Sequence, residues 1–281
     1  MKFGASTFIW VSPFSNDTMY LFDKVKQQGF DVLEVCIENP DTIHPATIKK
    51  AAESAGVEVL ICGAFGPDRD ISADDPVTRQ AGVKYIKTCI DIAAEVGSKL
   101  VSGPMYSEVG RFGLQTPDAK KQRNAWAVEN MQVVAAYAKD AGVKLAVEPL
   151  NRFETDFLNT VEQGLAFFEQ IGADHVGFLL DTFHMNIEEK KMGEAIKRAG
   201  SKIFNFHACA NDRGTPGSGN INWDEVKEAL KATQYNDYLV IESFNTDITE
   251  IARAVSLWRP LATSADGLAT EGLSFLKKQF S

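Results

Sequence analysis

Cysteine is scarce in this chain, with four in 281 residues, and no two of them form a CxxC pair. Each of the four lies inside an apolar segment: Cys36, Cys62, Cys89 and Cys209. Scattered cysteines in apolar surroundings are typical of reduced core residues. The spacing therefore argues against a disulfide framework and against a cysteine-based zinc cluster.

The chain also lacks an excess of positive charge, any low-complexity segment and any apolar run long enough to cross a bilayer. Its 29 Lys and Arg against 38 Asp and Glu give a net charge of −9, which disfavours nucleic-acid binding, because that affinity comes mainly from basic side chains. A small neutral or cationic ligand, or a metal ion, is the expected partner. The N-terminal segment MKFGASTFIW has no small-residue cleavage site, so we expect a first strand, not a secretory signal, and a cytoplasmic protein.

What the sequence does contain is an alternation of short apolar runs with helical patterns. Six helical segments end on a glycine, which accepts the left-handed conformation that closes a helix: Gly29, Gly56, Gly97, Gly142, Gly172 and Gly200. The runs between the helices predict eight strands, at residues 3–10, 32–38, 58–65, 99–105, 144–150, 176–182, 203–209 and 238–244.

Strands that are apolar almost throughout and are separated by helices should be parallel and buried on both faces. Eight such units close naturally into a (β/α)8 TIM barrel, and no internal linker divides the chain, so we expect residues 1–281 to form one domain. A doubly wound open sheet is the alternative. The longest loops follow the fourth and seventh strands, and both leave the C-terminal strand ends, where barrel enzymes carry their chemistry.

A polar residue stands at the C-terminal end of each of the last four predicted strands: Glu148, Asp181, His207 and Glu242. In a barrel these four residues, here called the arc, would converge at the mouth. Each alone could be a helix cap or half of a salt bridge. Three carboxylates at close range, however, raise one another's pKa, and burial of unpaired charge is costly, so the arc calls for a cation. Three oxygen ligands and one nitrogen favour Mn²⁺, Mg²⁺ or Co²⁺ over zinc.

Three further polar residues lie on the loops of the same strands: Glu154, His184 and Arg213. Glu154 and Arg213 could be surface charges and His184 a capping residue, but their place on arc-bearing loops favours contact with a substrate. The other two histidines, His44 and His175, are predicted to lie in loops far from the barrel mouth.

The segments VEPLNRFET, LLDTFHMNIEE, FHACANDRGTPGSGNINWDEV and VIESF, followed by VSLWRPL, resemble the ketose 3-epimerase family, that of the D-tagatose and D-psicose (allulose) 3-epimerases, among the xylose isomerase-like barrels. The resemblance spans nearly the whole chain. It implies that the arc binds the metal, usually Mn²⁺ or Co²⁺, that Glu148 and Glu242 are the catalytic acid/base pair, and that Glu154, His184 and Arg213 hold the ketose near C1 to C3. It also implies a homo-oligomer, a dimer or a tetramer.

The implied chemistry suits these residue types. Epimerisation at C3 removes a proton next to the C2 carbonyl and returns one to the opposite face of a planar cis-enediolate, which requires a base on each side. Two glutamates from separated strands can flank the sugar. The metal would polarise the carbonyl and stabilise the negative charge that develops on oxygen.

The sequence departs from the family pattern at two places. Ser243 follows Glu242 where relatives commonly have proline, and the segment after the fourth strand lacks a tryptophan that many relatives carry. The serine is expected to alter backbone rigidity beside Glu242, and the missing tryptophan leaves the preference at C4 to C6 of the sugar open. The residues that would contact C4 to C6 form one wall of the substrate site. Candidates for that wall, each equally compatible with core packing, are Phe8, Trp10, Phe65, Met105, Tyr106 and Phe244.

Other functions remain compatible with the same residues. An aldose–ketose isomerase or a keto-inositol dehydratase would need much the same groups, with the substrate placed differently. A non-catalytic sugar-binding protein would be expected to have lost a ligand or a base, and none is lost. A DNA-repair endonuclease of the same superfamily would need a histidine-rich zinc cluster, which four histidines and an acidic chain disfavour.

Overall fold

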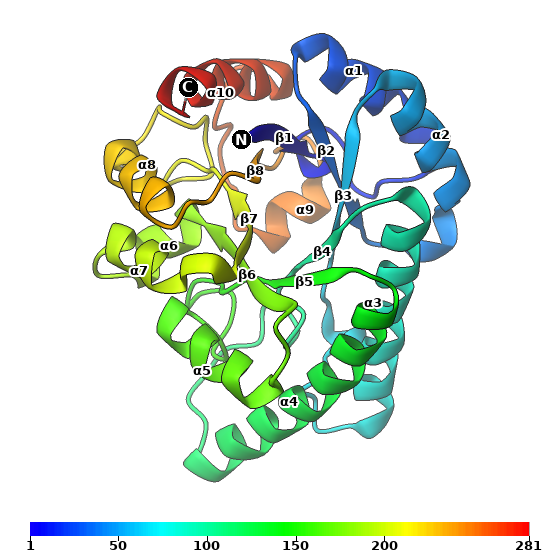
Figure 1. The fold of residues 1–281 in the computed structure, drawn as a ribbon, viewed down its shortest axis with the longest axis vertical. Helices are drawn as coiled ribbons and strands as arrows, with labels where there is room; N and C mark the ends of the chain where they lie inside the picture. Colours follow the sequence, from blue (N-terminus) through cyan, green and yellow to red (C-terminus); the bar gives the residue numbers. More distant parts are fainter. Residues whose placement is uncertain (281) are drawn as a thin grey trace.

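Eight parallel strands form a closed barrel in the computed structural model, which describes residues 1–280 (Figure 1). The strands are β1 (Lys2–Ser6), β2 (Val32–Ile37), β3 (Glu58–Gly63), β4 (Leu100–Gly103), β5 (Lys144–Val147), β6 (Val176–Asp181), β7 (Ile203–His207) and β8 (Tyr238–Ile241). Each strand pairs with the next, and β8 pairs with β1. This closure confirms the predicted (β/α)8 barrel and excludes the open sheet. The predicted strands run past the observed carboxyl ends, because apolar residues continue into the barrel mouth.

Helices surround the barrel on its outside, except for α9 (Thr249–Ala254), which lies over the middle of the barrel in the view of Figure 1. They are α1 (Tyr20–Gln28), α2 (Pro45–Ala55), α3 (Pro76–Val96), α4 (Pro117–Asp140), α5 (Val161–Ile171), α6 (Thr182–Glu188), α7 (Met192–Ala199), α8 (Trp223–Ala232), α9 (Thr249–Ala254) and α10 (Ala265–Phe280). Short 3₁₀ turns occupy Thr7–Ile9, Asn16–Thr18, Pro40–Thr42, Pro67–Arg69 and Gly200–Lys202. The six helix-closing glycines all have positive φ, between 57° and 90°, but Gly200, with ψ of −133°, lies outside the left-handed helical conformation that was predicted for it.

An apolar layer fills the inside of the barrel below its mouth. Seven strands contribute one residue each: Val32, Leu60, Leu100, Ala146, Leu179, Phe204 and Val240. The eighth strand, β1, contributes Gly4, where an added Cβ would lie only 3.1 Å from Val240 Cγ2 and 3.2 Å from Val32 Cβ. Since side chains alternate along a strand, residues two positions further along point inward as well, one layer closer to the mouth. On a regular strand, the residue two positions after each member of this layer is therefore expected to face the barrel mouth.

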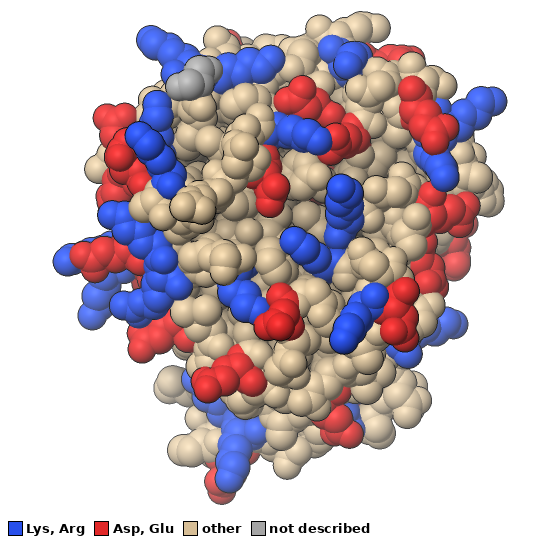
Figure 2. Space-filling view, viewed as in Figure 1, with Lys and Arg blue, Asp and Glu red and all other residues tan. Residues whose placement is uncertain are grey.

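No helix within residues 1–280 combines the length and the hydropathy needed to cross a membrane. On the face drawn in Figure 2, basic and acidic side chains are interspersed over the surface. The negative net charge is therefore not gathered in one region of that face.

Candidate metal and substrate site

The four residues of the arc meet at the barrel mouth. Glu148, Asp181 and Glu242 each follow an inward-facing residue of the apolar layer by two positions, so the alternation of the strand turns them inward too. One potential ligand atom from each of the four lies within 4.8 Å of all the others. His207 Nδ1 is 3.5 Å from Glu242 Oε2, 3.8 Å from Asp181 Oδ2 and 3.9 Å from Glu148 Oε1. The structure thus brings together the residues that the sequence predicted as ligands.

His207 reaches the arc through an irregularity in the pairing of β7 with β6. Phe178 pairs with Ile203, but the next residue, Leu179, pairs with Asn205, which leaves Phe204 as one extra residue in β7. A bulge of this kind changes which side chains face inward. Phe204 can therefore join the apolar layer while His207, three positions later, still points into the mouth.

The arc has the electrostatics of a cation site. All four residues are at most 5% exposed, and both Glu148 Oε1 and His207 Nδ1 are buried without a hydrogen-bond partner among the described residues. Burial and the charge of Glu242 raise the pKa of Glu148 well above its usual value. Burial also raises the pKa of Asp181, although Arg213 opposes the shift. A divalent cation would fit this donor set, because it would satisfy both unpaired atoms and compensate the carboxylates.

The histidine of the arc is held from behind by a second buried carboxylate, Glu34. Glu34 Oε1 lies 2.8 Å from His207 Nε2, and Glu34 Oε2 accepts a hydrogen bond from Asn205 Nδ2 at 2.8 Å. Burial lowers the pKa of His207, but the carboxylates of Glu34 and Glu242 outweigh it, so the net shift is upward. A carboxylate on the far nitrogen keeps the proton at Nε2 and leaves Nδ1 free to bind a metal.

Arg213 connects the metal ligands to the predicted substrate residues. Its Nη1 donates to Asp181 Oδ2 and to Glu242 Oε2, both at 2.7 Å. Although burial opposes the change, the charges of His207 and Arg213 lower the pKa of Glu242. The Arg213 guanidinium also lies over the rings of Phe183 and Phe244, at 4.2 and 5.1 Å. The aromatic faces and the carboxylates together fix a buried charge that would otherwise be costly.

His184 and Glu154 are fixed by a common neighbour, Asn151. The backbone N–H of Asn151 donates to His184 Nδ1 at 3.0 Å, and its Nδ2 donates to Glu154 Oε1 at 2.8 Å. His184 Nε2 faces Arg213, 2.9 Å from Nη2. Burial and the charge of Arg213 lower the pKa of His184 well below its usual value, which keeps the ring neutral. Because Nδ1 accepts from Asn151, Nε2 is the ring nitrogen that could bond to a sugar hydroxyl group, in place of its contact with Arg213.

Ser243, one of the departures from the family pattern, supports Arg213. Its hydroxyl donates to the Arg213 carbonyl oxygen at 2.6 Å. Arg213 has φ of 67°, a backbone conformation that is unfavourable for a side chain with a Cβ. A proline at position 243 could not make this bond, so the serine contributes to holding the arginine in place.

A cavity of about 500 Å³ opens above the arc. Five of the predicted polar site residues line it: Glu148, Glu154, His184, Arg213 and Glu242. Its size is within the range of small-molecule sites. Phe8, Phe65 and Phe244 also line the cavity, as expected for a wall against the sugar.

The other wall candidates lie elsewhere, which corrects the sequence expectation. Trp10 borders a separate depression and donates its indole N–H to Asp266 Oδ1 at 2.7 Å. Tyr106 and Met105 are fully buried, and the Tyr106 hydroxyl donates to Leu158 O at 3.1 Å. All three residues lie beyond the end of a strand, Trp10 after β1 and the other two after β4, where sequence alternation no longer fixes the direction of a side chain.

Sequence reasoning missed three supporting residues: Glu34, Asn151 and Asn205. A signal for two of them exists, since Glu34 and Asn205 are polar residues in the middle of the apolar runs VLEVCI and IFNFH. A fully buried acid in such a run requires a partner. Asn151 gives no comparable signal, because it follows a strand, where polar residues are common.

Comparison with known proteins agrees with this geometry. Residues 22–279 match the family model of the xylose isomerase-like TIM barrel. The chain is 37% identical over 280 residues to a probable ketose 3-epimerase of Synechocystis sp., and the match covers 100% of this chain and 97% of that protein. The chain belongs to the ketose 3-epimerase family. It is also 32% identical to a D-psicose 3-epimerase of Agrobacterium fabrum, covering 95% of this chain and 93% of that one.

Solved structures extend the family likeness to three dimensions. A D-allulose 3-epimerase from Methylomonas sp., crystallised in complex with D-allulose, matches with a TM-score of 0.94 and 26% identity. The match covers 99% of this chain and 97% of that chain. The resemblance to ketose 3-epimerases that the motifs suggested is therefore confirmed over the whole barrel.

Proposed function

We propose that this member of the ketose 3-epimerase family interconverts free ketoses that differ at C3, such as D-fructose, D-psicose, D-tagatose and L-ribulose. The observation that carries the proposal is the pair Glu148 and Glu242, which enter one sugar-sized cavity from β5 and β8. Two relatives named for ketose or psicose 3-epimerisation support the choice of reaction. A divalent metal, with Mn²⁺ first and Co²⁺ or Mg²⁺ as alternatives, is proposed as the cofactor.

The residues of the cavity supply what the reaction needs. Glu148 and Glu242 come from strands that are separated by β6 and β7, so their carboxylates can address opposite faces of a sugar bound between them. One glutamate removes the C3 proton while the other returns a proton to the opposite face, through a cis-enediolate. A metal held by the arc supplies Lewis acidity to the carbonyl.

The neighbouring side chains orient the substrate. The Arg213 guanidinium and the neutral His184 ring line the same cavity and can hydrogen-bond to sugar oxygens near C1 to C3. Glu154 is positioned by Asn151 and can accept a hydrogen bond from a hydroxyl group. Phe8, Phe65 and Phe244 provide an apolar wall against the remainder of the sugar.

Isotope exchange tests the proposal. Chelator-treated protein, with and without added Mn²⁺, is incubated in D₂O with D-fructose, D-tagatose and L-ribulose in turn, and the products are followed by NMR. Metal-dependent deuterium at C3 together with the C3 epimer is expected. Glu148→Gln and Glu242→Gln should abolish exchange, whereas Glu169→Gln, at an exposed position of α5, should behave as wild type.

Two other results would redirect the assignment. Deuterium at C1 or C2 with an aldose product would make the protein an aldose–ketose isomerase. Absence of exchange with every ketose would refute the epimerase proposal. A homo-oligomeric assembly and a cytoplasmic location remain predictions from the sequence and its resemblance.

A further inference from the structure

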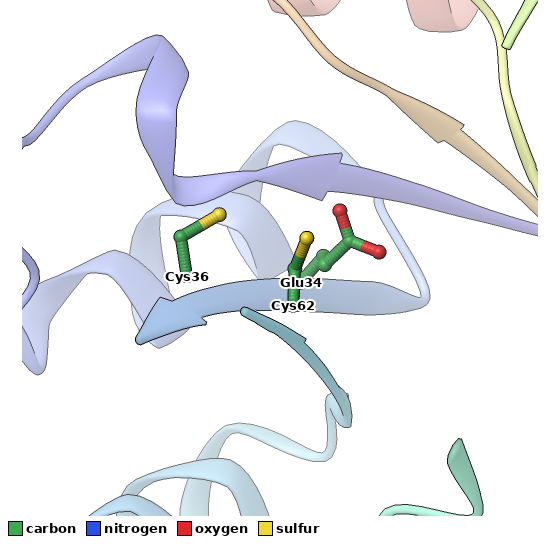
Figure 3. Close-up of side chains that lie close together, drawn as sticks. All are labelled: Glu34, Cys36 and Cys62. Carbon is green, nitrogen blue, oxygen red and sulfur yellow. The ribbon is translucent and has the colours of Figure 1, made fainter. Parts of the chain in front are cut away.

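A second group of possible metal ligands lies inside the barrel: Glu34, Cys36 and Cys62 (Figure 3). One ligand atom from each lies within 4.8 Å of the other two. Glu34 and Cys36 are two positions apart on β2, and Cys36 pairs directly with Cys62 on β3, so all three side chains point to the same side. From their spacing in the sequence the two cysteines are expected to be separate core residues, but the strand register brings them together.

The ligand types differ from those of the arc. Two thiol sulfurs and one carboxylate oxygen suit thiophilic divalent cations, whereas the arc offers no sulfur. Bonds of about 2.0–2.3 Å in a tetrahedral site place ligand atoms roughly 3.3–3.8 Å apart. The observed ligand atoms lie within 4.8 Å of one another, so a bound ion would draw them closer together.

The surroundings allow a cation to enter and be compensated. Cys62 lines the cavity above the arc, beside Phe8 and Phe65, whereas Glu34 and Cys36 are fully buried, so an ion would reach the group from the cavity past Cys62. The neighbouring Cys36 thiol, burial and the charge of Glu34 raise the pKa of the Cys62 thiol, so a cation that binds this sulfur must displace its proton. Ser6 Oγ, 3.3 Å from Cys36 Sγ, can donate a hydrogen bond to the resulting thiolate.

Glu34 can bind a cation in this group and still keep its hydrogen bond with His207. A carboxylate accepts about four hydrogen bonds or ligand contacts through its two oxygens, and the described contacts of Glu34 use only two, to His207 and to Asn205. The remaining lone pairs are available to a cation next to the cysteines.

We propose that Cys36, Cys62 and Glu34 form a second metal site, selective for thiophilic cations such as Cd²⁺ and Zn²⁺, with the fourth position open to the cavity. Binding forms two metal–sulfur bonds and one metal–oxygen bond. The two displaced thiol protons pass to buffer, and water leaves the ion as the protein ligands replace it.

Titration with Cd²⁺ tests the site directly. The protein is first saturated with Mn²⁺, kept reduced with a phosphine reagent, and titrated while the thiolate-to-Cd²⁺ charge-transfer absorption is recorded in the ultraviolet. We expect one equivalent of Cd²⁺ per chain to produce this absorption. Cys36→Ala and Cys62→Ala should each weaken Cd²⁺ binding by more than about 100-fold, since loss of a direct ligand exceeds the roughly 10–100-fold cost of losing an outer partner.

A matched control uses another buried cysteine. Cys89→Ala, on α3, removes a thiol that is not part of the cluster and should leave the titration unchanged. Cys36→Ser, which keeps a hydrogen-bonding side chain of similar size, serves in place of any alanine variant that does not fold. Two results would overturn the proposal: no charge-transfer absorption in the wild type, or an absorption that persists in the Cys36 and Cys62 variants. Neither result depends on the epimerase activity.

Discussion

Replacing Glu34 with glutamine should weaken Mn²⁺ binding at the arc, although residue 34 is not itself one of the arc ligands. The carboxylate is completely buried and uses both oxygens, toward His207 Nε2 and Asn205 Nδ2, each at 2.8 Å. Glutamine offers one oxygen and one NH₂ group, so one of these two donors would face another donor. If the NH₂ group faces His207, the ring proton must move to Nδ1, which is the atom that faces the other arc ligands.

The size of the effect follows from the role of such partners. Loss of a carboxylate that orients a metal-binding histidine typically costs 10–100-fold in affinity, or about 1.4–2.7 kcal/mol. Isothermal titration of chelator-treated protein with Mn²⁺ should therefore show a dissociation constant raised by that factor in Glu34→Gln.

A control separates orientation of the histidine from damage to the core. Ser102→Ala removes only the contact of Ser102 Oγ with Asn205 Nδ2, at 3.2 Å, and leaves the Glu34–His207 pair intact. It should change Mn²⁺ affinity by less than about threefold. Equal affinities in Glu34→Gln and the wild type, with thermal unfolding confirming a folded apo protein, would refute the reasoning.

Arg213→Ala should raise KM more than it lowers kcat if the guanidinium mainly holds the sugar, and steady-state kinetics with the preferred ketose would contradict this if kcat fell alone. Ser243→Ala leaves the buried Arg213 carbonyl without its 2.6 Å hydrogen bond, so urea denaturation should show a free energy of unfolding lower by about 1–3 kcal/mol. An unchanged urea midpoint would argue against a stabilising role for this hydrogen bond. Gly164→Ala would place a Cβ 2.2 Å from Phe178 Cε1, so calorimetry should show about 1–3 kcal/mol of destabilisation. A variant as stable as the wild type would show that the Phe178 ring can move. Mn²⁺ at about 100 times its dissociation constant should add about 2.7 kcal/mol to the stability of a barrel that folds without it, and equal melting temperatures with and without chelator would contradict metal binding to the native state.

The sequence by itself determined the barrel and the four residues of the arc. Apolar runs that alternate with glycine-terminated helices require parallel strands buried on both faces, and eight of them close on themselves. Polar residues at the ends of four consecutive strands of a barrel are then expected to converge at its mouth. These inferences depend on local periodicity and on the order of elements, both of which a single sequence contains.

Only the tertiary structure decided which residues meet across strands. Glu34 lies 173 positions before His207 and the two are in contact because β2 and β7 face each other through the barrel interior. Cys36 and Cys62 became neighbours through the register of β2 with β3, and His207 reached the arc through an extra residue in β7. Trp10 and Tyr106 were misplaced for the same reason: beyond a strand end the backbone path sets the direction of a side chain. That path follows from packing between distant elements, which periodicity along the chain does not encode.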